Sequence, residues 1–445
     1  MFYKAQHKET GNMWDVWLFH HHDIYYLYYL GNTDYVEGEL PWDNISLATS
    51  TDCVHWTEQG PILKKSETAN WMGTGSTWKS PNFDEDQSFY MNFSEEIGDR
   101  QNIYFAASKD LINWNRLEGE DYRFVQDEQW YQKKGRWDCI WTLAKAGGGL
   151  YGYWTACPIS NESKFGFGES EDGIHWKALE PPKVSGIDRE HSEVGAVEKI
   201  GNKYYMLMGN YFPYMVTLIA DEPHGPFLPA QKNFNLLTGH TYFCRFFSHP
   251  SGTMLVCHFI MTRFGEVSFA PLKVARVDDE GTLRLGWWEG NEPMKHNAVS
   301  LVQTDDLETD IVFLKDKLDT STGIILEGHL CLPNSKEEPR SGVFIECKDG
   351  IDYAVLFDHL GKAEVGVMQK SDLAFETEKS IDREILFDQN PRFRLLLKGE
   401  LMEFYLDDIL IESFALSRVA TGRIGFIRSP ESIQPLTAWK WHLQE

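Results

Sequence analysis

The sequence has few of the features that mark disulfide-rich, metal-binding or membrane proteins. Its seven cysteines are scattered along the chain, form no C-x-x-C pair and are odd in number. This pattern argues against a complete disulfide framework and a cysteine zinc site, and it favours buried free thiols. No apolar run approaches the roughly 20 residues of a membrane-spanning helix, and residues 1–4 lack signal-peptide character. The sequence therefore predicts a cytoplasmic protein, provided that no leader has been removed.

Basic residues are scarce relative to acidic ones. The chain has 42 Lys and Arg against 67 Asp and Glu, which gives a formal charge of -25. Such a charge repels phosphate groups, so nucleic acid and anionic membranes are disfavoured as partners, whereas a neutral small molecule suffers no such penalty. The sequence carries no signal for the oligomeric state.

Long helical periodicities are also hard to find. Aromatic residues make up 14% of the 445 residues and include 16 Trp. This composition favours an all-β protein with many surfaces for stacking. A prior of roughly 150 residues per domain allows two or three domains, and we take two as the starting expectation.

A turn motif recurs in the first two-thirds of the chain. Three segments read S-x-D-x-x-x-W, and we expect the Ser and Asp to form a turn and the Trp to anchor the next strand: residues 50–56, 108–114 and 170–176. Around them lie five predicted strands, most of them rich in tyrosine, at residues 24–30, 88–93, 150–154, 203–208 and 253–258. Repetition at tens of residues with several strands per unit indicates a β-propeller, in which each repeat is one blade. We therefore predict a five-bladed β-propeller over residues 1–292.

The repeat stops after residue 292. Residues 393–397 and 402–406 are predicted to form a hairpin, and residues 422–427 resemble a closing strand. Residues 293–445 are therefore predicted to form a C-terminal β-sandwich. Acidic residues such as Asp407 and Asp408 fall in turns there, so we expect this domain to support the propeller and to carry no chemistry.

Carboxylates occupy matching positions in three blades. The segment just ahead of each of the five strands should line the central channel. Asp15 lies in such a segment, Asp138 repeats its Trp-Asp context, and Glu193 follows in the next blade. A turn Asp that bonds its own backbone is the ordinary explanation for a single Asp, but the repetition favours a shared site. Glycosidic hydrolysis needs a carboxylic acid that protonates the leaving oxygen and a carboxylate that acts as nucleophile or as base.

These residues resemble the five-bladed glycosidases of glycoside hydrolase families 32 (invertases, levanases, inulinases) and 43 (arabinofuranosidases, xylosidases). Members share an Asp on blade one, an Asp on blade three and a Glu on blade four, which Asp15, Asp138 and Glu193 match. The D-P-N-G, R-D-P and E-C-P motifs of family 32 correspond to D-V-W-L at residues 15–18, R-W-D-C at 136–139 and E-V-G at 193–195. Glycine and histidine at residues 239–240 resemble family 43, whereas the sandwich is typical of family 32.

The resemblance implies a glycoside hydrolase acting on a small neutral oligosaccharide or glycoside, of the β-fructoside or arabinoside type. Asp15, Asp138 and Glu193 would be the catalytic residues, with Glu193 as general acid. No cofactor would be required, and a structural calcium ion in the propeller channel stays open. Family 32 members retain the anomeric configuration and family 43 members invert it. The sandwich and the position of Asp15 favour retention, whereas the pattern at residues 239–240 favours inversion. The altered motifs leave a second function open, a non-catalytic carbohydrate-binding protein.

Further residues are candidates for binding substrate. Trp14, Trp17 and Trp78 serve either as sugar platforms or as packing between blades. Arg136 would either hold Asp138 ionised or bind a sugar hydroxyl, or else be an ordinary surface arginine. His240 would lie at the channel, either as a binding residue or as a pocket histidine whose hydrogen bonds are satisfied. We predict no metal ligand, because the run of histidines at residues 20–22 alternates between the two faces of a strand. The acidic residues at 188 and 190 lie close to Glu193 but lack its spacing.

Overall fold

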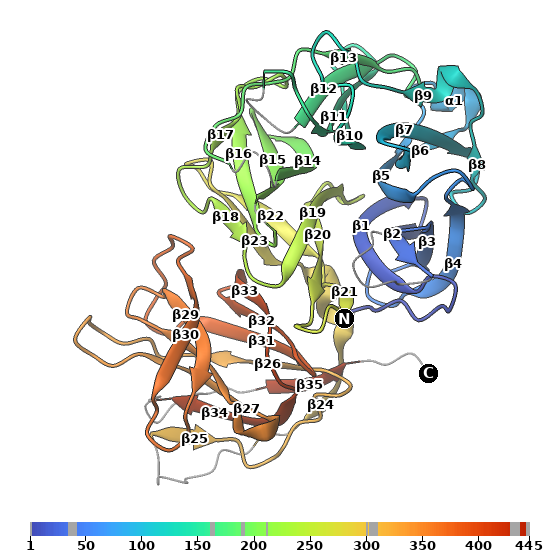
Figure 1. The fold of residues 1–445 in the computed structure, drawn as a ribbon. Helices are drawn as coiled ribbons and strands as arrows, with labels where there is room; N and C mark the ends of the chain where they lie inside the picture. The colour runs from blue at the N-terminus through green and yellow to red at the C-terminus, as the bar shows by residue number, and fades with distance from the viewer. Residues whose placement is uncertain are drawn as a thin grey trace.

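The computed structural model describes residues 2–33, 42–160, 165–187, 192–210, 212–299, 301, 310–427 and 437–441. Helix in these ranges is limited to α1 (Phe83–Asp86) and three short 3-10 turns, η1 (Glu120–Tyr122), η2 (Glu289–Met294) and η3 (Lys348–Gly350). None of these helices is long and apolar enough to cross a membrane. Five antiparallel sheet units surround a common axis, and a two-sheet sandwich follows them (Figure 1). The predicted all-β fold, a five-bladed β-propeller followed by a β-sandwich, is confirmed.

Each blade is an antiparallel meander. Blade 1 contains β1 (Asn12–His21), β2 (Ile24–Asn32), β3 (Asn44–Ser50) and β4 (Thr57–Lys64). Blade 2 contains β5 (Trp71–Lys79), β6 (Phe89–Ile97), β7 (Arg100–Ser108), β8 (Asn115–Arg116) and β9 (Arg123–Phe124). Blade 3 contains β10 (Trp137–Ala144), β11 (Leu150–Ala156), β12 (Phe165–Ser170) and β13 (Lys177–Leu179). Blade 4 contains β14 (Ser192–Ile200), β15 (Lys203–Asn210), β16 (Met215–Ala220), β17 (Leu228–Pro229) and β18 (Asn235–Leu237). Blade 5 contains β19 (Thr241–Ser248), β20 (Met254–Met261), β21 (Val267–Phe269), β22 (Lys273–Val277) and β23 (Leu283–Trp287).

The first strands of the blades form the inner ring. β1, β5, β10, β14 and β19 each contact the first strand of both neighbouring blades. The tyrosine-rich strands predicted from the sequence are the second strands, which lie one step further out. In β2, Tyr26 and Tyr28 pack into one core cluster, whereas Tyr25 and Tyr29 pack into another. Both faces of the strand are therefore buried between blades, which explains the continuous apolar run in the sequence.

The S-x-D-x-x-x-W segments form the predicted turns. In the first of them, the Ser50 hydroxyl accepts the backbone N–H of Cys53, and Asp52 Oδ1 accepts the N–H groups of Val54 and His55 at 2.9 and 2.8 Å. The other two segments repeat these bonds. Trp56 is buried at the end of the first turn.

The ring is closed by residues from the start of the chain. The N–H of Tyr3 donates to the carbonyl of Phe269 in blade 5 at 2.9 Å, and the reverse bond is 2.7 Å long. The Tyr3 ring also packs against Trp56 of blade 1, with centroids 6.3 Å apart. This segment therefore joins blade 1 to blade 5.

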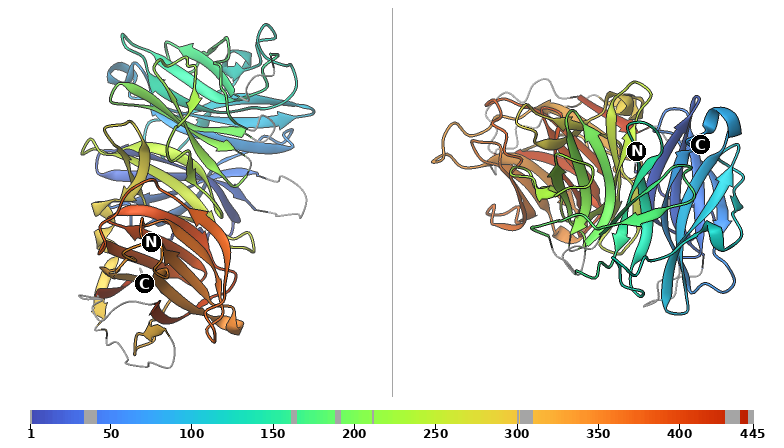
Figure 2. Two further views of the ribbon diagram at one scale, coloured as in Figure 1. Left: turned by 90° about the vertical axis from the view of Figure 1, so that its left-hand side faces the viewer. Right: turned by 90° about the horizontal axis from the view of Figure 1, so that it is seen from above.

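The sandwich consists of two antiparallel sheets. One continues from blade 5 through β33 (Ile409–Ala415), β32 (Leu401–Leu406), β31 (Arg392–Lys398), β26 (Ile324–His329), β35 (Thr437–Trp441) and β24 (Lys295–Val299). The other contains β25 (Ile311–Phe313), β34 (Ala420–Ile427), β27 (Ser341–Cys347), β28 (Tyr353–Phe357), β29 (Ala363–Met368) and β30 (Phe375–Ile381). The predicted boundary at residues 292/293 falls within η2. The sandwich lies beside blade 5, to one side of the ring (Figure 1 and Figure 2).

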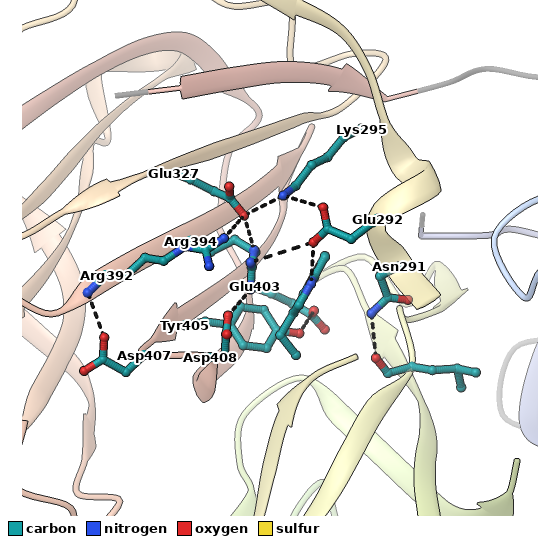
Figure 3. A network of polar contacts seen from close by, with 12 residues as sticks. Asn291, Glu292, Lys295, Glu327, Arg392, Arg394, Glu403, Tyr405, Asp407 and Asp408 are labelled. Carbon is teal, nitrogen blue, oxygen red and sulfur yellow. Dashed lines mark hydrogen bonds and ion pairs between the residues drawn. The ribbon is translucent and has the colours of Figure 1, made fainter. Parts of the chain in front are cut away.

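A polar network joins the sandwich to blade 5 (Figure 3). Lys273 of blade 5 pairs with Glu403 of the sandwich, and both side chains are fully buried. The Arg394 guanidinium lies 4.0 Å from the ring centroid of Trp287, whose indole N–H donates to Glu292 at 2.9 Å. Removing the Glu403 carboxylate alone would leave the charge of Lys273 buried without its ion-pair partner, a cost of several kcal/mol.

Candidate active site

Every first strand carries a β-bulge, and in blades 1, 3 and 4 the predicted carboxylate lies at or beside it. The register with the second strand shifts at Trp14/Val16, Gly73/Ser76, Asp138/Trp141, Val194/Ala196 and Tyr242/Arg245. Asp15, Cys139 and Phe243 adopt positive φ angles of 28°, 50° and 54° at these bulges. The other two blades have glycine there: a Cβ on Gly75 or Gly195 would lie 1.6 or 2.5 Å from a backbone oxygen. Since a bulge redirects the neighbouring side chains, the repeated irregularity forms one ring of inward-directed positions.

Two of the predicted carboxylates meet at one arginine, and the third lies close to both of them. Arg136 Nη2 lies 2.9 Å from Asp138 Oδ2, and Arg136 Nη1 lies 2.6 Å from Glu193 Oε1. Burial would lower the pKa of the guanidinium, but the charges of Glu193 and Asp138 outweigh it and leave that pKa raised. The charges of Glu193 and Asp138 also raise the pKa of Asp15, so the Asp15 carboxyl lies close to both. The structure thus brings together the three predicted catalytic residues and Arg136.

The three carboxylates differ in how they are held. Asp138 is 4% exposed, and its second oxygen accepts the Ser94 hydroxyl. Glu193 Oε2 accepts the Tyr242 hydroxyl at 3.1 Å, so both of its oxygens are engaged. Asp15 Oδ2 accepts the Thr74 hydroxyl, but Asp15 Oδ1 is buried and has no hydrogen-bond partner among the described residues. Of the six carboxylate oxygens, Asp15 Oδ1 is therefore the one without a hydrogen-bond partner among the described residues.

The environment of Asp15 favours its protonated form. Burial raises the pKa of this carboxyl, and the charge of Glu193 raises it further; the hydrogen bond from Thr74 and the charge of Arg245 act in the opposite direction. The net result is a pKa of about 8. Below that pH, the resting site therefore keeps a proton on Asp15.

Arg245 is buried inside the ring and bridges two of the bulges. Its side chain is fully buried, and its guanidinium lies 4.4 Å from the ring centroid of Phe243 and 5.3 Å from that of Trp141. It donates to the carbonyl of Gly195 and, at 3.5 Å, to that of Gly75. Arg245 thus ties the bulge that follows Glu193 to the bulge that follows Thr74.

Three of the predicted substrate-binding residues lie elsewhere. Trp17 is 1% exposed and donates to Thr77 Oγ1 at 3.0 Å, and Trp78 is 5% exposed and packs edge-on against Trp176. Both fill the space between blades, so the prediction that they bind sugar is wrong. His240 packs against Phe414 of β33, and burial lowers its pKa to about 4. It belongs to the contact with the sandwich and not to the channel.

Trp14 remains at the site. It is partly exposed and stacks on Trp42, with centroids 5.4 Å apart and an interplanar angle of 20°.

Asp188 and Glu190 lie outside the described residues. Among the residues that the structure describes, no group of three His, Cys, Asp or Glu side chains is arranged to hold a metal ion.

Several site residues were not predicted from the sequence. Thr74 and Ser94 both come from blade 2, which supplies hydroxyl donors but no carboxylate. Tyr242 and Arg245 come from blade 5. A charged Arg inside the apolar run Tyr-Phe-Cys-Arg-Phe-Phe was the one available signal for Arg245, since a lone buried charge needs partners.

The fold is shared with solved enzyme structures. Sucrose-6-phosphate hydrolase from Lactobacillus gasseri is similar with a TM-score of 0.73 and 15% identity, over 99% of this chain and 93% of that chain. A variant of the Bombyx mori GH32 β-fructofuranosidase in complex with sucrose has a TM-score of 0.70 and 13% identity, over 100% of this chain and 93% of that chain. A variant of fructan 1-exohydrolase IIa from Cichorium intybus in complex with 1-kestose has a TM-score of 0.70 and 12% identity, over 100% of this chain and 98% of that chain. No protein-family model and no curated protein sequence match this chain. The resemblance stated from the sequence is confirmed for the fold.

Proposed function

We propose that this protein is a retaining glycoside hydrolase that cleaves a small neutral oligosaccharide or glycoside of the β-fructoside type. The observation that carries the proposal is the pairing of Asp138 and Glu193 with Arg136 close to Asp15, whose Oδ1 is the one oxygen of the three carboxylates without a hydrogen-bond partner among the described residues. The structurally similar proteins include a sucrose-6-phosphate hydrolase and enzymes bound to sucrose and 1-kestose, which supports a fructoside.

The roles follow from how each carboxylate is held. Asp15 has a free oxygen and is the nucleophile, which forms a covalent glycosyl intermediate. Glu193 is the general acid that protonates the leaving oxygen and then the base that activates water. Asp138, bonded at both oxygens, binds sugar hydroxyls and fixes Arg136.

The protonation states require one transfer before reaction. In the resting site the proton resides on Asp15 below about pH 8, and Glu193 is paired with Arg136. Catalysis needs the same proton on Glu193.

The test is turnover of sucrose, 1-kestose, inulin, levan and a panel of nitrophenyl glycosides. Glu193→Gln should lower kcat/KM by about 10²- to 10⁴-fold, the usual contribution of a general acid, without changing the fold. Glu222→Gln, at an exposed glutamate, is the matched control. The first anomer seen by NMR should keep the configuration of the substrate. Binding without turnover by the native protein would instead support the carbohydrate-binding alternative.

Two further expectations belong to this proposal. None of the seven cysteines, all of which the structure describes, forms a disulfide, which favours a reducing compartment such as the cytoplasm. Arg245 places a cation in the ring next to Asp15, so we infer that the site needs no calcium ion for charge balance.

A further inference from the structure

An aromatic wall stands next to Glu193, and we define it as Trp14, Trp42 and Phe212 with Tyr242 and Phe259 behind them. The Trp14 ring lies 5.4 Å from Trp42, 6.2 Å from Phe212 and 4.7 Å from Phe259, measured between centroids. The rings of Trp42 and Phe212 are tilted from that of Trp14 by only 20° and 27°. Blades 1, 4 and 5 therefore contribute to one continuous apolar surface.

Exposure differs sharply across the wall. Tyr242 is 4% exposed and Phe259 is fully buried, whereas Phe212 is 47% exposed. A phenyl ring has no polar atom to satisfy, so leaving half of it in water forfeits apolar burial. Phe212 therefore presents a flat, uncovered apolar face at the edge of the site.

The wall is tied to one side of Glu193. Oε2 of Glu193 accepts the hydroxyl of Tyr242 at 3.1 Å, and the Tyr242 ring meets Phe212 edge-on with centroids 4.8 Å apart. Oε1 of Glu193 instead faces the cationic side chain of Arg136. The two oxygens of Glu193 thus separate an aromatic side of the site from a charged side, where Asp138 also lies.

We propose that Phe212, backed by Tyr242 and Trp14, forms the subsite for the leaving group. The inference rests on the proposed function: the general acid must reach the leaving oxygen, so the leaving group lies beside Glu193. The charged side, with Arg136 and Asp138, suits the hydroxyls of the sugar that is transferred. The aromatic side takes a leaving group with an apolar face, either an aryl group or the C–H face of a pyranose.

The experiment compares glycosides that share one sugar and differ in the leaving group: aryl, pyranosyl and methyl. Phe212→Ala should lower kcat/KM by about tenfold for a leaving group that stacks on the ring, the size of one good aromatic contact. The methyl glycoside should change by less than about twofold, since a methyl group barely covers a ring. If kcat/KM falls only for the aryl substrate or only for the pyranosyl substrate, that result identifies the leaving group that stacks on Phe212.

Phe264→Ala is the matched control, because Phe264 is 75% exposed and belongs to the loop between β20 and β21. It should leave all three substrates unchanged. Equal losses for the three leaving groups in Phe212→Ala, or no loss, would overturn the subsite while leaving the hydrolase proposal intact.

Absence of turnover in the native protein would count against the hydrolase proposal and not by itself against the subsite. Calorimetric titration with the phenyl and pyranosyl glycosides then decides. Binding of either ligand that weakens about tenfold in Phe212→Ala but not in Phe264→Ala supports the subsite. Unchanged binding, or no binding by the native protein, overturns it.

Discussion

Replacing Asp15 with Asn should stabilise the protein while it abolishes activity. Asp15 is 9% exposed, and its pKa is raised from 3.8 to about 8 by burial and by the charge of Glu193. Between these two pH values the folded protein keeps a proton that the unfolded chain has released. The free energy of unfolding therefore falls as pH rises, by about 1.4 kcal/mol per pH unit for one proton.

The accumulated loss can be estimated for pH 7. The interval from 3.8 to 7 spans about three pH units, so Asp15 lowers the free energy of unfolding by at most about 4 kcal/mol. Asn is neutral at every pH, has nearly the same shape and still accepts the Thr74 hydroxyl. Asp15→Asn should therefore recover much of this loss, and the gain should grow from pH 4 to pH 8.

Denaturant titrations of both proteins at several pH values in this interval measure the effect. Asp279→Asn, at an exposed carboxylate in the turn before β23, is the control and should not change the pH dependence. Equal free energies of unfolding for native protein and Asp15→Asn across the interval would refute the electrostatic reasoning.

Other predictions concern the same site and its supports. The profile of kcat/KM should fall above about pH 8, because the Asp15–Glu193 pair then loses the proton that the leaving group needs, and a profile that is flat to pH 9 or higher would contradict this. Arg245→Met should raise the pKa of Asp15 and move the fall of the kcat/KM profile to a pH about one unit higher. Arg245→Lys keeps the charge and should move it less. Identical pH profiles for the two variants would show that Arg245 has a purely structural role. Glu403→Gln should lower the free energy of unfolding by about 3 to 5 kcal/mol, because it leaves Lys273 buried without its partner, and unaltered denaturation curves would be the contrary outcome. Treatment with EDTA should change neither activity nor melting temperature. Activity that EDTA removes and added calcium restores would contradict this prediction.

The parts of the fold that were predicted correctly are those that local sequence determines. The turn formed by Ser50 and Asp52 uses bonds within six residues, so its repetition marks the blades directly. The positions of Asp15, Asp138 and Glu193 follow from the blade repeat, because each lies just ahead of a second strand.

The parts that were missed depend on contacts between blades. Thr74 reaches Asp15 from another blade, and Arg245 reaches backbone carbonyls of two others, so no spacing in the sequence brings them together. The bulge at Asp15 also breaks the alternation of β1, and a sequence pattern does not reveal which of Trp14 and Trp17 then remains at the site. His240 was misplaced because the docking of the sandwich leaves no local pattern.

The closure of the ring by Tyr3 sets an order for assembly during synthesis. The backbone partner of Tyr3 is Phe269, so the first segment of the chain leaves the ribosome long before the strand that it pairs with. Until blade 5 has been made, one flank of blade 1 lacks its neighbour, and apolar surface such as Trp56 is exposed to other chains. We expect ring closure to be the last and slowest step, since it joins the most distant parts of the propeller sequence. Blades that fold early are therefore held in an open arc, and the active site, which draws on all five, comes into existence only at that final step.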